Sequence, residues 1–293
     1  MGTPDPMLER AARAMVETDL LLGAALVPLT VRPVEGLAPS SSEVTERATE
    51  RSPARSTSAP GPAAAGTDGS VVVESDPATS GESSIGVGTP AVPMEELVGD
   101  SVPEKLADLA VRHAAECSHC TASTTHLNIV FGEGAADASL MFVGEAPGER
   151  EDRSGRPFVG PAGEKLDQMI GAMGFSRESV YISNVLKTRP PENRTPRPDE
   201  AAACGRWLAS QIELIRPTVI VALGGPAAKL LLGTETGITR LRGVWGRYDV
   251  GELRIPVMPT FHPAYVLRQY TADVRAAVWN DLQLARDLVR SSE

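Results

Sequence analysis

The 293-residue chain is poor in cysteine and in aromatic residues, and it contains no long hydrophobic run. Three cysteines are too few for a disulfide-rich scaffold. No stretch reaches the ~18 consecutive apolar residues of a membrane span, and no basic segment followed by an apolar one opens the chain. We therefore expect no membrane partner and no secretion, and we predict a cytoplasmic location.

Two common glycine-rich phosphate-binding motifs are also missing. The most glycine-rich loop, GEAPGEREDRSGRPFVGPAG at 144–163, is neither a GxGxxG fingerprint nor a GK[ST] phosphate loop. We expect no nucleotide cofactor.

The chain has little positive charge on average, but the charge is uneven. The net charge is −10, of which residues 1–93 carry −6 and the remainder −4. Because only nearby charges survive screening by salt, a local basic patch on the second part can still bind nucleic acid. Charge alone therefore does not exclude a DNA partner.

Composition divides the chain into three parts. Residues 1–30 include an apolar stretch at 7–27 that predicts an isolated helix, either docked weakly on the main domain or free to bind a protein partner. Residues 31–95 are rich in Ser, Thr, Pro, Gly and Ala, which predicts a disordered linker. Residues 96–293 have the composition of a folded domain.

The folded part alternates apolar strands with helices. The predicted strands cover 140–145, 180–187, 217–225 and 255–263. The predicted helices cover 96–116, 163–175, 199–215, 226–233 and 271–290. This order predicts an α/β fold with a parallel sheet covered on both faces, whose ligands bind beyond the carboxyl ends of the strands.

Polar loops follow these strand ends. The first loop presents Glu145, Glu151 and Phe158 beside glycines, and the fourth presents His262 with its backbone restrained by Pro263. Tight turns or a structural histidine are the alternatives. The position at the strand ends favours a functional site.

The loop after the second strand is basic. Lys187, Arg189, Arg194 and Arg197 lie within fourteen residues that contain one acidic residue, and Asn184 opens the segment. A solvated loop is one interpretation, and contact with DNA phosphates is the other.

Cys117 and Cys120 have the spacing of metal ligands, and Cys204 is the third cysteine. Two cysteines do not fill a tetrahedral site, and His119 between them cannot easily turn onto the same metal. Spacing alone leaves metal binding open.

Several longer motifs together resemble family 4 uracil-DNA glycosylases, a bacterial and archaeal class that carries an iron–sulfur cluster. The matching motifs are FGEG (131–134), the loop at 144–163, YISNVLKTRPPENRTP (181–196), ALGGPAA (222–228), RGVWG (242–246) and TFHPAYVLR (260–268). The resemblance implies a monomeric three-layer αβα sandwich with a central four-stranded parallel sheet. It also implies base excision repair, in which uracil is flipped out of single- or double-stranded DNA and its N-glycosidic bond is hydrolysed.

The resemblance assigns roles to positions of this chain. Phe158 would stack on uracil, Asn184 would read its edge, and His262 would hydrogen-bond its oxygen. Where the best-known enzymes have a water-activating Asp, this chain has Ala146, so Glu145 or Glu151 would substitute, with Glu151 preferred. The remaining implied contacts are Gly144 and Asn193 for substrate, and Lys187, Arg189, Arg194 and Arg268 for DNA.

One position departs from the family. The family's third cluster cysteine lies in a KCRPP motif, and Thr188 occupies that place, while Cys117, Cys120 and Cys204 match the other three ligands. The open alternatives are a [4Fe–4S] cluster completed by water, Thr188 or a histidine such as His126, a three-iron cluster, or no cluster.

Two other functions compete with uracil excision. A non-catalytic DNA-lesion-binding module would keep the same fold, but we expect it to lose Phe158, Asn184 or His262, and all three are present. A related group that crosslinks to the abasic sugar carries a basic insert with a histidine after the second strand. No such insert follows the second strand of this chain.

Overall fold

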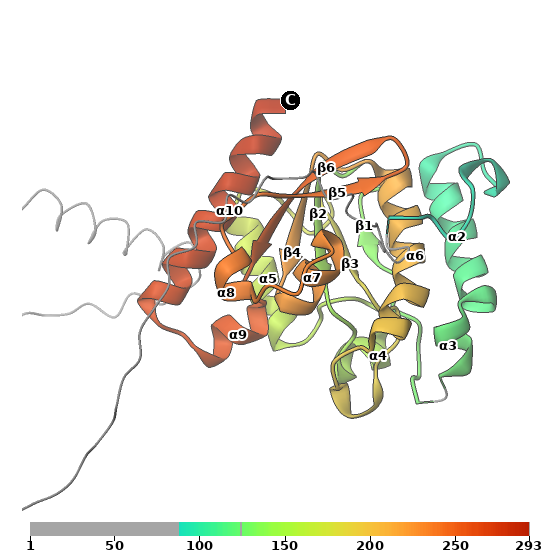
Figure 1. Cartoon of the computed structure of the whole chain (residues 1–293), viewed down its shortest axis with the longest axis horizontal. Coiled ribbons are helices and arrows are strands. Elements are labelled where there is room, and N and C mark those ends of the chain that lie inside the picture. Colours follow the sequence, from blue (N-terminus) through green and yellow to red (C-terminus); the bar gives the residue numbers. More distant parts are fainter. Residues whose placement is uncertain (1–87, 124, 293) are drawn as a thin grey trace, which may run out of the picture. The chain divides into compact units, whose positions relative to one another are not determined.

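A six-stranded sheet forms the centre of the computed structural model, which describes residues 88–123 and 125–292 (Figure 1). The strand order is β1-β3-β2-β4-β6-β5, and β3, β2, β4 and β6 are parallel. The strands are β1 (Glu133–Gly134), β2 (Leu140–Gly144), β3 (Tyr181–Asn184), β4 (Val219–Leu223), β5 (Gly246–Val250) and β6 (Leu253–Thr260). The predicted helix at 7–27 lies outside the described residues.

The four parallel strands confirm the predicted sheet, and two antiparallel edge strands extend it. β1 pairs with β3, and β5 forms a hairpin with β6. Neither edge strand carries the uniform apolar run that marks the central strands. β1 has only two residues, and β5 alternates between buried and exposed positions because one of its faces meets solvent.

Helices cover both faces of the sheet, as predicted. The α-helices are α2 (Val102–Glu116), α3 (Ser118–Ala122), α4 (Glu149–Ser154), α5 (Pro161–Ala172), α6 (Pro198–Ile215), α7 (Gly225–Leu232), α8 (Ile238–Leu241), α9 (Pro263–Arg268) and α10 (Ala272–Ser292). Short 3-10 turns are η1 (Met94–Glu96) and η2 (Pro191–Asn193). None of the described helices is both long and apolar enough to cross a membrane.

Successive residues of the central strands point into two separate cores. In β2, Met141 and Val143 pack with α2 and α6, whereas Leu140 and Phe142 pack with α5 and α10. Figure 1 shows α2 and α6 on one side of the sheet and α5 and α10 on the other. Every residue of β2 is buried, so the strand is apolar along its whole length. Both of its faces must be covered by helices, which gives the three layers.

The strand register brings the functional loops to one edge. Gly144 at the end of β2 pairs with Asn184 at the end of β3, and Leu223 at the end of β4 pairs with Thr260 at the end of β6. The loops that leave these four residues therefore start side by side.

The described domain begins before residue 96. The amide of Ala91 donates to the Arg206 carbonyl and to Ser210 Oγ on α6, and Val92 is buried in the core. Ala91 and Val92 thus pack on the domain although their composition matched that of the predicted linker, so the folded domain extends beyond the predicted boundary at 96 toward the N-terminus.

Candidate active site and metal cluster

A cavity of about 630 Å³ lies at the carboxyl ends of the parallel strands. It collects residues from all four loops that the sequence singled out. Among those predicted, its lining contains Glu145, Ala146, Glu151, Phe158, Asn184, Asn193, Arg194, His262 and Arg268.

The Phe158 ring is presented to this cavity by a backbone that its neighbours hold in place. Phe158 has a positive φ of 51°, a strained conformation for a non-glycine residue. Arg177 donates to the carbonyls of Phe158 and Pro157, and α5 approaches so closely that a Cβ on Gly163 would overlap the Phe158 carbonyl. These contacts therefore hold the strained backbone of Phe158, and with it the ring, in place before any ligand binds.

The Asn184 side chain lies at the end of β3 beside that ring. It is buried, and its Oδ1 has no hydrogen-bond partner among the described residues. A Cβ on Gly144 would overlap both Asn184 Oδ1 and the Phe158 ring, so glycine is required for the two side chains to meet here. A buried polar atom without a partner is costly, which makes this amide a candidate for ligand recognition.

His262 enters the cavity from the first turn of α9. Its Nδ1 accepts a hydrogen bond from the Ala264 amide at 3.1 Å, so in the neutral ring the proton lies on Nε2. The pKa of His262 is lowered to about 4, first by burial and then by the positive charge of Arg268, while the negative charge of Glu151 opposes the shift. The ring stacks on Phe158 with centroids 5.6 Å apart. The cavity therefore holds a neutral imidazole that can donate from Nε2.

The two candidate carboxylates differ in their contacts. Glu151 accepts from the amides of Val159 and Gly160 at 2.9 Å each and from Gly148 at 3.2 Å. The Glu145 carboxylate has no hydrogen-bond or ion-pair partner within the described part of the chain, and burial raises its pKa. Glu151 thus organises the loop backbone, whereas Glu145 is available to a ligand.

Lys187 was predicted to contact DNA, and the structure contradicts this prediction. Lys187 is completely buried, and its Nζ donates to Ser183 Oγ at 2.6 Å, the Asn184 carbonyl at 2.8 Å and Gln211 Oε1 at 2.6 Å. Burial lowers its pKa to about 8, and the nearby cysteines oppose this shift. Lys187 therefore supports the end of β3 from beneath instead of reaching a phosphate.

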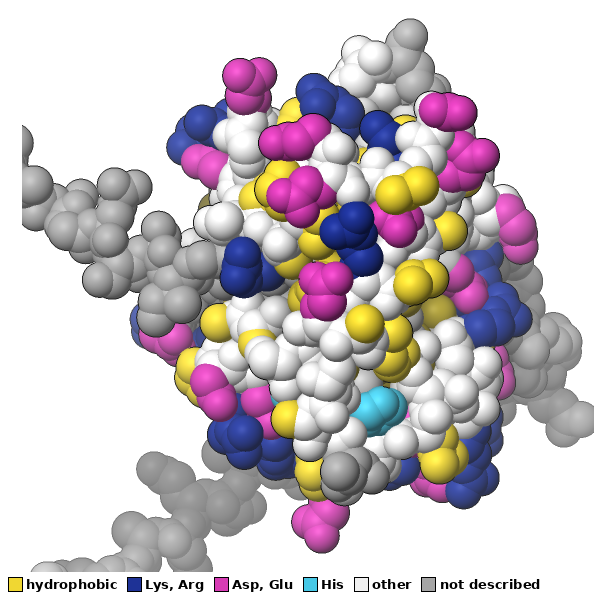
Figure 2. All heavy atoms as spheres, turned by 90° about the vertical axis from the view of Figure 1, so that its right-hand side faces the viewer, with side chains coloured by type: hydrophobic (Ala, Val, Ile, Leu, Met, Phe, Trp, Pro, Cys, Tyr) yellow, Lys and Arg dark blue, Asp and Glu magenta, His cyan; other side chains and the backbone are white. Residues whose placement is uncertain are grey.

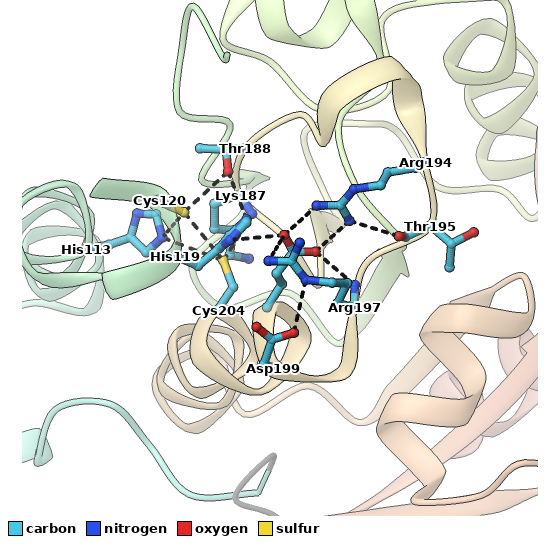
Figure 3. Close-up of polar contacts among 11 residues, drawn as sticks. His113, His119, Cys120, Lys187, Thr188, Arg194, Thr195, Arg197, Asp199 and Cys204 are labelled. Atoms are coloured by element: carbon cyan, nitrogen blue, oxygen red, sulfur yellow. Dashed lines mark hydrogen bonds and ion pairs between the residues drawn. The ribbon is translucent and has the colours of Figure 1, made fainter. Parts of the chain in front are cut away.

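The rest of the basic loop is partly neutralised. Arg194 makes a two-pronged contact with Glu200 of α6, and Arg197 pairs with the same carboxylate (Figure 3). The hydrogen bond from Arg194 lowers the pKa of Glu200 to about 2. Arg189 donates to Asn193 at 2.8 Å. The sequence count missed this carboxylate because Glu200 belongs to the following helix.

Three buried cysteines and one histidine form a cluster outside the residues that line the cavity. Its members are His113, Cys117, Cys120 and Cys204, and their ligand atoms all lie within 4.8 Å of one another. Contacts with the other two thiols hold the pKa of Cys117 far below its usual range, while contact with Cys117 raises the pKa of Cys120 to about 12. The group could hold a metal, and the sequence did not predict His113 as its fourth member.

The spacing of His113 carried a signal that was overlooked. His113 precedes Cys117 by four residues at the end of α2, one helical turn away, so both side chains share a face. Of the ligands considered from sequence, Thr188 contacts the cluster, with Oγ1 3.6 Å from Cys120 Sγ, and His126 does not belong to it.

Comparison with known proteins finds that the chain is similar to uracil-DNA glycosylases. The model of the Uracil DNA glycosylase superfamily matches residues 131–283. A Type-4 uracil-DNA glycosylase of Thermotoga maritima is 44% identical over 188 residues, covering 64% of this chain and 96% of that protein. A Type-4 uracil-DNA glycosylase of Archaeoglobus fulgidus is 41% identical over 189 residues, covering 63% and 94%. A Type-5 uracil-DNA glycosylase of Pyrobaculum aerophilum is 33% identical over 149 residues, covering 45% and 63%.

Proposed function

The chain belongs to the uracil DNA glycosylase superfamily, and from this premise we propose how its cavity hydrolyses the N-glycosidic bond of deoxyuridine in DNA. The bond between C1′ of the sugar and N1 of uracil breaks, water adds its oxygen to C1′, and the base leaves as free uracil. The abasic site that remains is the product on which base excision repair continues.

The observation that carries the assignment is the unpaired amide of Asn184 beside the Phe158 ring. Uracil offers an acceptor oxygen and an N–H donor side by side on one edge, and a carboxamide matches both. Cytosine presents a donor where uracil presents the oxygen, so the same amide disfavours it. A flat aromatic ring supplies the stacking surface that a flipped base needs.

His262 acts on the charge that develops during bond cleavage. Electrons move onto the uracil oxygen as the base departs, and the neutral Nε2–H donates to that oxygen. Its hydrogen bond from Ala264 orients the ring, so little reorganisation is needed during the reaction.

We assign the carboxylate role to Glu145 and not to Glu151, which the sequence favoured. The transition state has a cationic sugar, which a nearby negative charge stabilises. Glu151 already accepts three backbone hydrogen bonds, whereas Glu145 lines the cavity with its oxygens unengaged by the described residues. Glu151 then keeps the loop in shape around Phe158.

DNA contacts follow from the residues left exposed around the cavity. Arg268 at the end of α9 is exposed, and Arg189 and Arg194 are partly exposed. We propose that the half-buried Ala264 and Tyr265 of α9 enter the minor groove of duplex DNA and fill the space left by the flipped nucleotide. Both single- and double-stranded DNA are proposed as substrates, as the family resemblance implies.

The cysteine–histidine cluster plays a structural part in this proposal. The resemblance implies a [4Fe–4S] cluster on four thiolates, but Thr188 occupies the place of the third, and Cys120 Sγ and Cys204 Sγ lie only 3.7 Å apart. The residues present do not fit that group, so no step of the reaction is derived through it.

Three narrower predictions remain part of the proposal. A monomeric state, a cytoplasmic location and a protein partner for the predicted helix at 7–27 all rest on sequence reasoning. The extent of the predicted linker before residue 88 is a further prediction that rests on sequence reasoning.

A single-turnover assay tests the proposed activity. The full chain is mixed in excess with a labelled oligonucleotide that contains one uracil, and alkali then cleaves any abasic site. We expect strand cleavage at the uracil and release of free uracil. The His262→Ala variant should be slower by about 10²-fold or more, the effect of one lost oxyanion donor. Tight binding without cleavage would instead support the lesion-binding module.

A further inference from the structure

The four members of the cysteine–histidine cluster converge on one small volume. Cys120 Sγ lies 3.7 Å from Cys204 Sγ, and His113 Nε2 lies 3.4 Å from Cys120 Sγ and 3.8 Å from Cys204 Sγ. Figure 3 shows the His113 ring turned toward these sulfurs. Three sulfurs and one imidazole nitrogen are thus presented from α2, the start of α3, and α6.

These separations match the geometry of a single tetrahedral ion. With Zn–S bonds of ~2.3 Å and a Zn–N bond of ~2.0 Å at tetrahedral angles, bound sulfurs stand about 3.8 Å apart and nitrogen stands about 3.5 Å from sulfur. The observed distances among His113, Cys120 and Cys204 agree with both values to within a few tenths of an ångström, and Cys117 Sγ lies within 4.8 Å of the other three ligand atoms. A Cys₃His set is also one of the common structural zinc sites.

An iron–sulfur cube would require a wider arrangement. Each thiolate of a [4Fe–4S] cluster binds a different iron, and inorganic sulfides lie between the irons, so the thiolates stand farther apart than two ligands of one ion. The hydroxyl of Thr188 lies where the family's third thiolate would be, 3.6 Å from Cys120 Sγ and 3.4 Å from His119 Nε2.

The cluster is buried, and aromatic rings pack against its histidine. His113 is fully buried, with its ring 5.4 Å from the Phe131 ring and 5.3 Å from the Trp207 ring. Its Nδ1 has no partner among the described residues, so the sulfurs at Nε2 are the ring's polar neighbours. Cys204 Sγ accepts a hydrogen bond from the Lys187 amide at 3.2 Å, a contact that favours a thiolate over a thiol.

We propose that His113, Cys117, Cys120 and Cys204 bind one zinc ion tetrahedrally, in place of the iron–sulfur cluster that the family resemblance implies. Zinc with three thiolates and a neutral imidazole carries one negative charge, which the buried Lys187 ammonium offsets. The ion joins α2 and α3 to α6 and braces the Lys187 segment beneath Asn184. It would thus perform the structural task of the cluster without redox chemistry.

Metal analysis tests this directly. The full-length protein is expressed in medium containing both iron and zinc and purified without oxygen, so that either centre survives. We expect about one zinc per chain, no stoichiometric iron or acid-labile sulfide, and a colourless solution. Three or four irons per chain with matching sulfide and a brown colour would overturn the proposal, and so would protein free of metal.

Variants test the role of His113. His113→Ala should release zinc to a chromophoric chelator at least about tenfold faster than the wild type, whereas His113→Cys should retain it. His126→Ala is the matched control, because His126 lies outside the cluster, and it should behave as the wild type. Cobalt(II) in the wild type should show the intense visible bands of a tetrahedral thiolate site. Equal release from His113→Ala and the wild type would remove His113 from the site.

Discussion

At the scale of single residues, the recognition that we propose rests on one unpaired amide oxygen. Asn184 Oδ1 is buried with no partner among the described residues, while the carbonyl of the same residue accepts a hydrogen bond from Lys187 Nζ. A site built to hydrogen-bond its substrate rejects analogues that cannot complete the bonds, often by 10⁴-fold or more. We therefore expect specificity for uracil to depend on this one side chain more than on the volume of the cavity.

The pH dependence of excision follows from His262 and Glu145. Because the pKa of His262 is lowered to about 4, its ring is already neutral at pH 6, and we expect a rate without an inflection near pH 6.5. The raised pKa of Glu145 means that its negative charge is lost at higher pH than in an ordinary glutamate. Single-turnover rates measured from pH 4 to 9 should therefore fall only on the acid side. An inflection near pH 6.5 that disappears in His262→Ala would contradict this assignment.

A pair of isosteric variants separates the two carboxylates. Glu145→Gln removes the charge near the sugar, and we expect the single-turnover rate to fall by on the order of 10²-fold with the melting temperature unchanged. Glu151→Gln replaces one acceptor oxygen with an amide that faces backbone donors, so it should lower the melting temperature as well as the rate. Loss of rate in Glu151→Gln alone, at unchanged stability, would return the catalytic role to Glu151.

At the scale of elements, the position of His262, the histidine that we propose to be catalytic, depends on how the end of β6 is anchored. The buried carboxylate of Asp281 in α10 accepts from Thr260 Oγ1 at 2.7 Å and from Arg242 Nε at 3.0 Å. Thr260 is the last residue of β6, two positions before His262. The contact therefore holds α10 and the strand end in fixed positions relative to the cavity.

Removing this anchor should destabilise the domain. Asp281→Ala removes the counter-charge of the partly buried Arg242 guanidinium, which keeps only its bond to the Ala277 carbonyl, and takes the acceptor from the buried Thr260 hydroxyl. We expect a loss of about 3 kcal/mol in the free energy of unfolding. Urea denaturation measures the loss. Asp287→Ala is the control, because Asp287 pairs with Arg286 at the surface and such exposed pairs contribute less than about 1 kcal/mol. Equal effects of the two variants would refute the anchoring role of Asp281.

The sequence predicted the strands whose residues are all buried, because such strands are apolar along their whole length. Strand β2 is buried on both faces, so its apolar run identifies it without further context. The edge strands depend on pairing with β3 and β6, and the hydrogen bonds of Glu151 and Glu200 depend on how their own loops fold. Composition records neither. Lys187 shows the limit most clearly, because a charged residue in a basic loop is normally exposed, and only the structure reveals its buried acceptors.

At the scale of the whole molecule, the charged side chains on one face of the domain are mixed in sign (Figure 2). The face that carries α2 mixes acidic, basic and hydrophobic side chains and offers no continuous basic surface (Figure 2). None of the described residues that line the cavity lies before Glu145. We therefore expect that the first 87 residues, which carry a net charge of −6, are not needed for the chemistry.

Truncation tests this independence. We expect deletion of residues 1–87 to leave the single-turnover rate on a short uracil oligonucleotide within about twofold, with DNA binding equal or slightly tighter because net negative charge is removed. A deletion to residue 93 should lower the melting temperature, because it also removes Ala91 and Val92, which pack on α6. A collapse of the rate in the shorter deletion would show that the first 87 residues belong to the active domain.

The preference for uracil over cytosine, compared between the wild type and Asn184→Asp, tests the central claim most directly. Single-turnover rates are measured on matched oligonucleotides that carry one uracil or one cytosine at the same place. We predict that the wild type excises uracil alone, and that Asn184→Asp lowers the ratio of the two rates by about 10²-fold or more, because a carboxyl group no longer matches the uracil edge. An unchanged ratio would contradict recognition of uracil by Asn184.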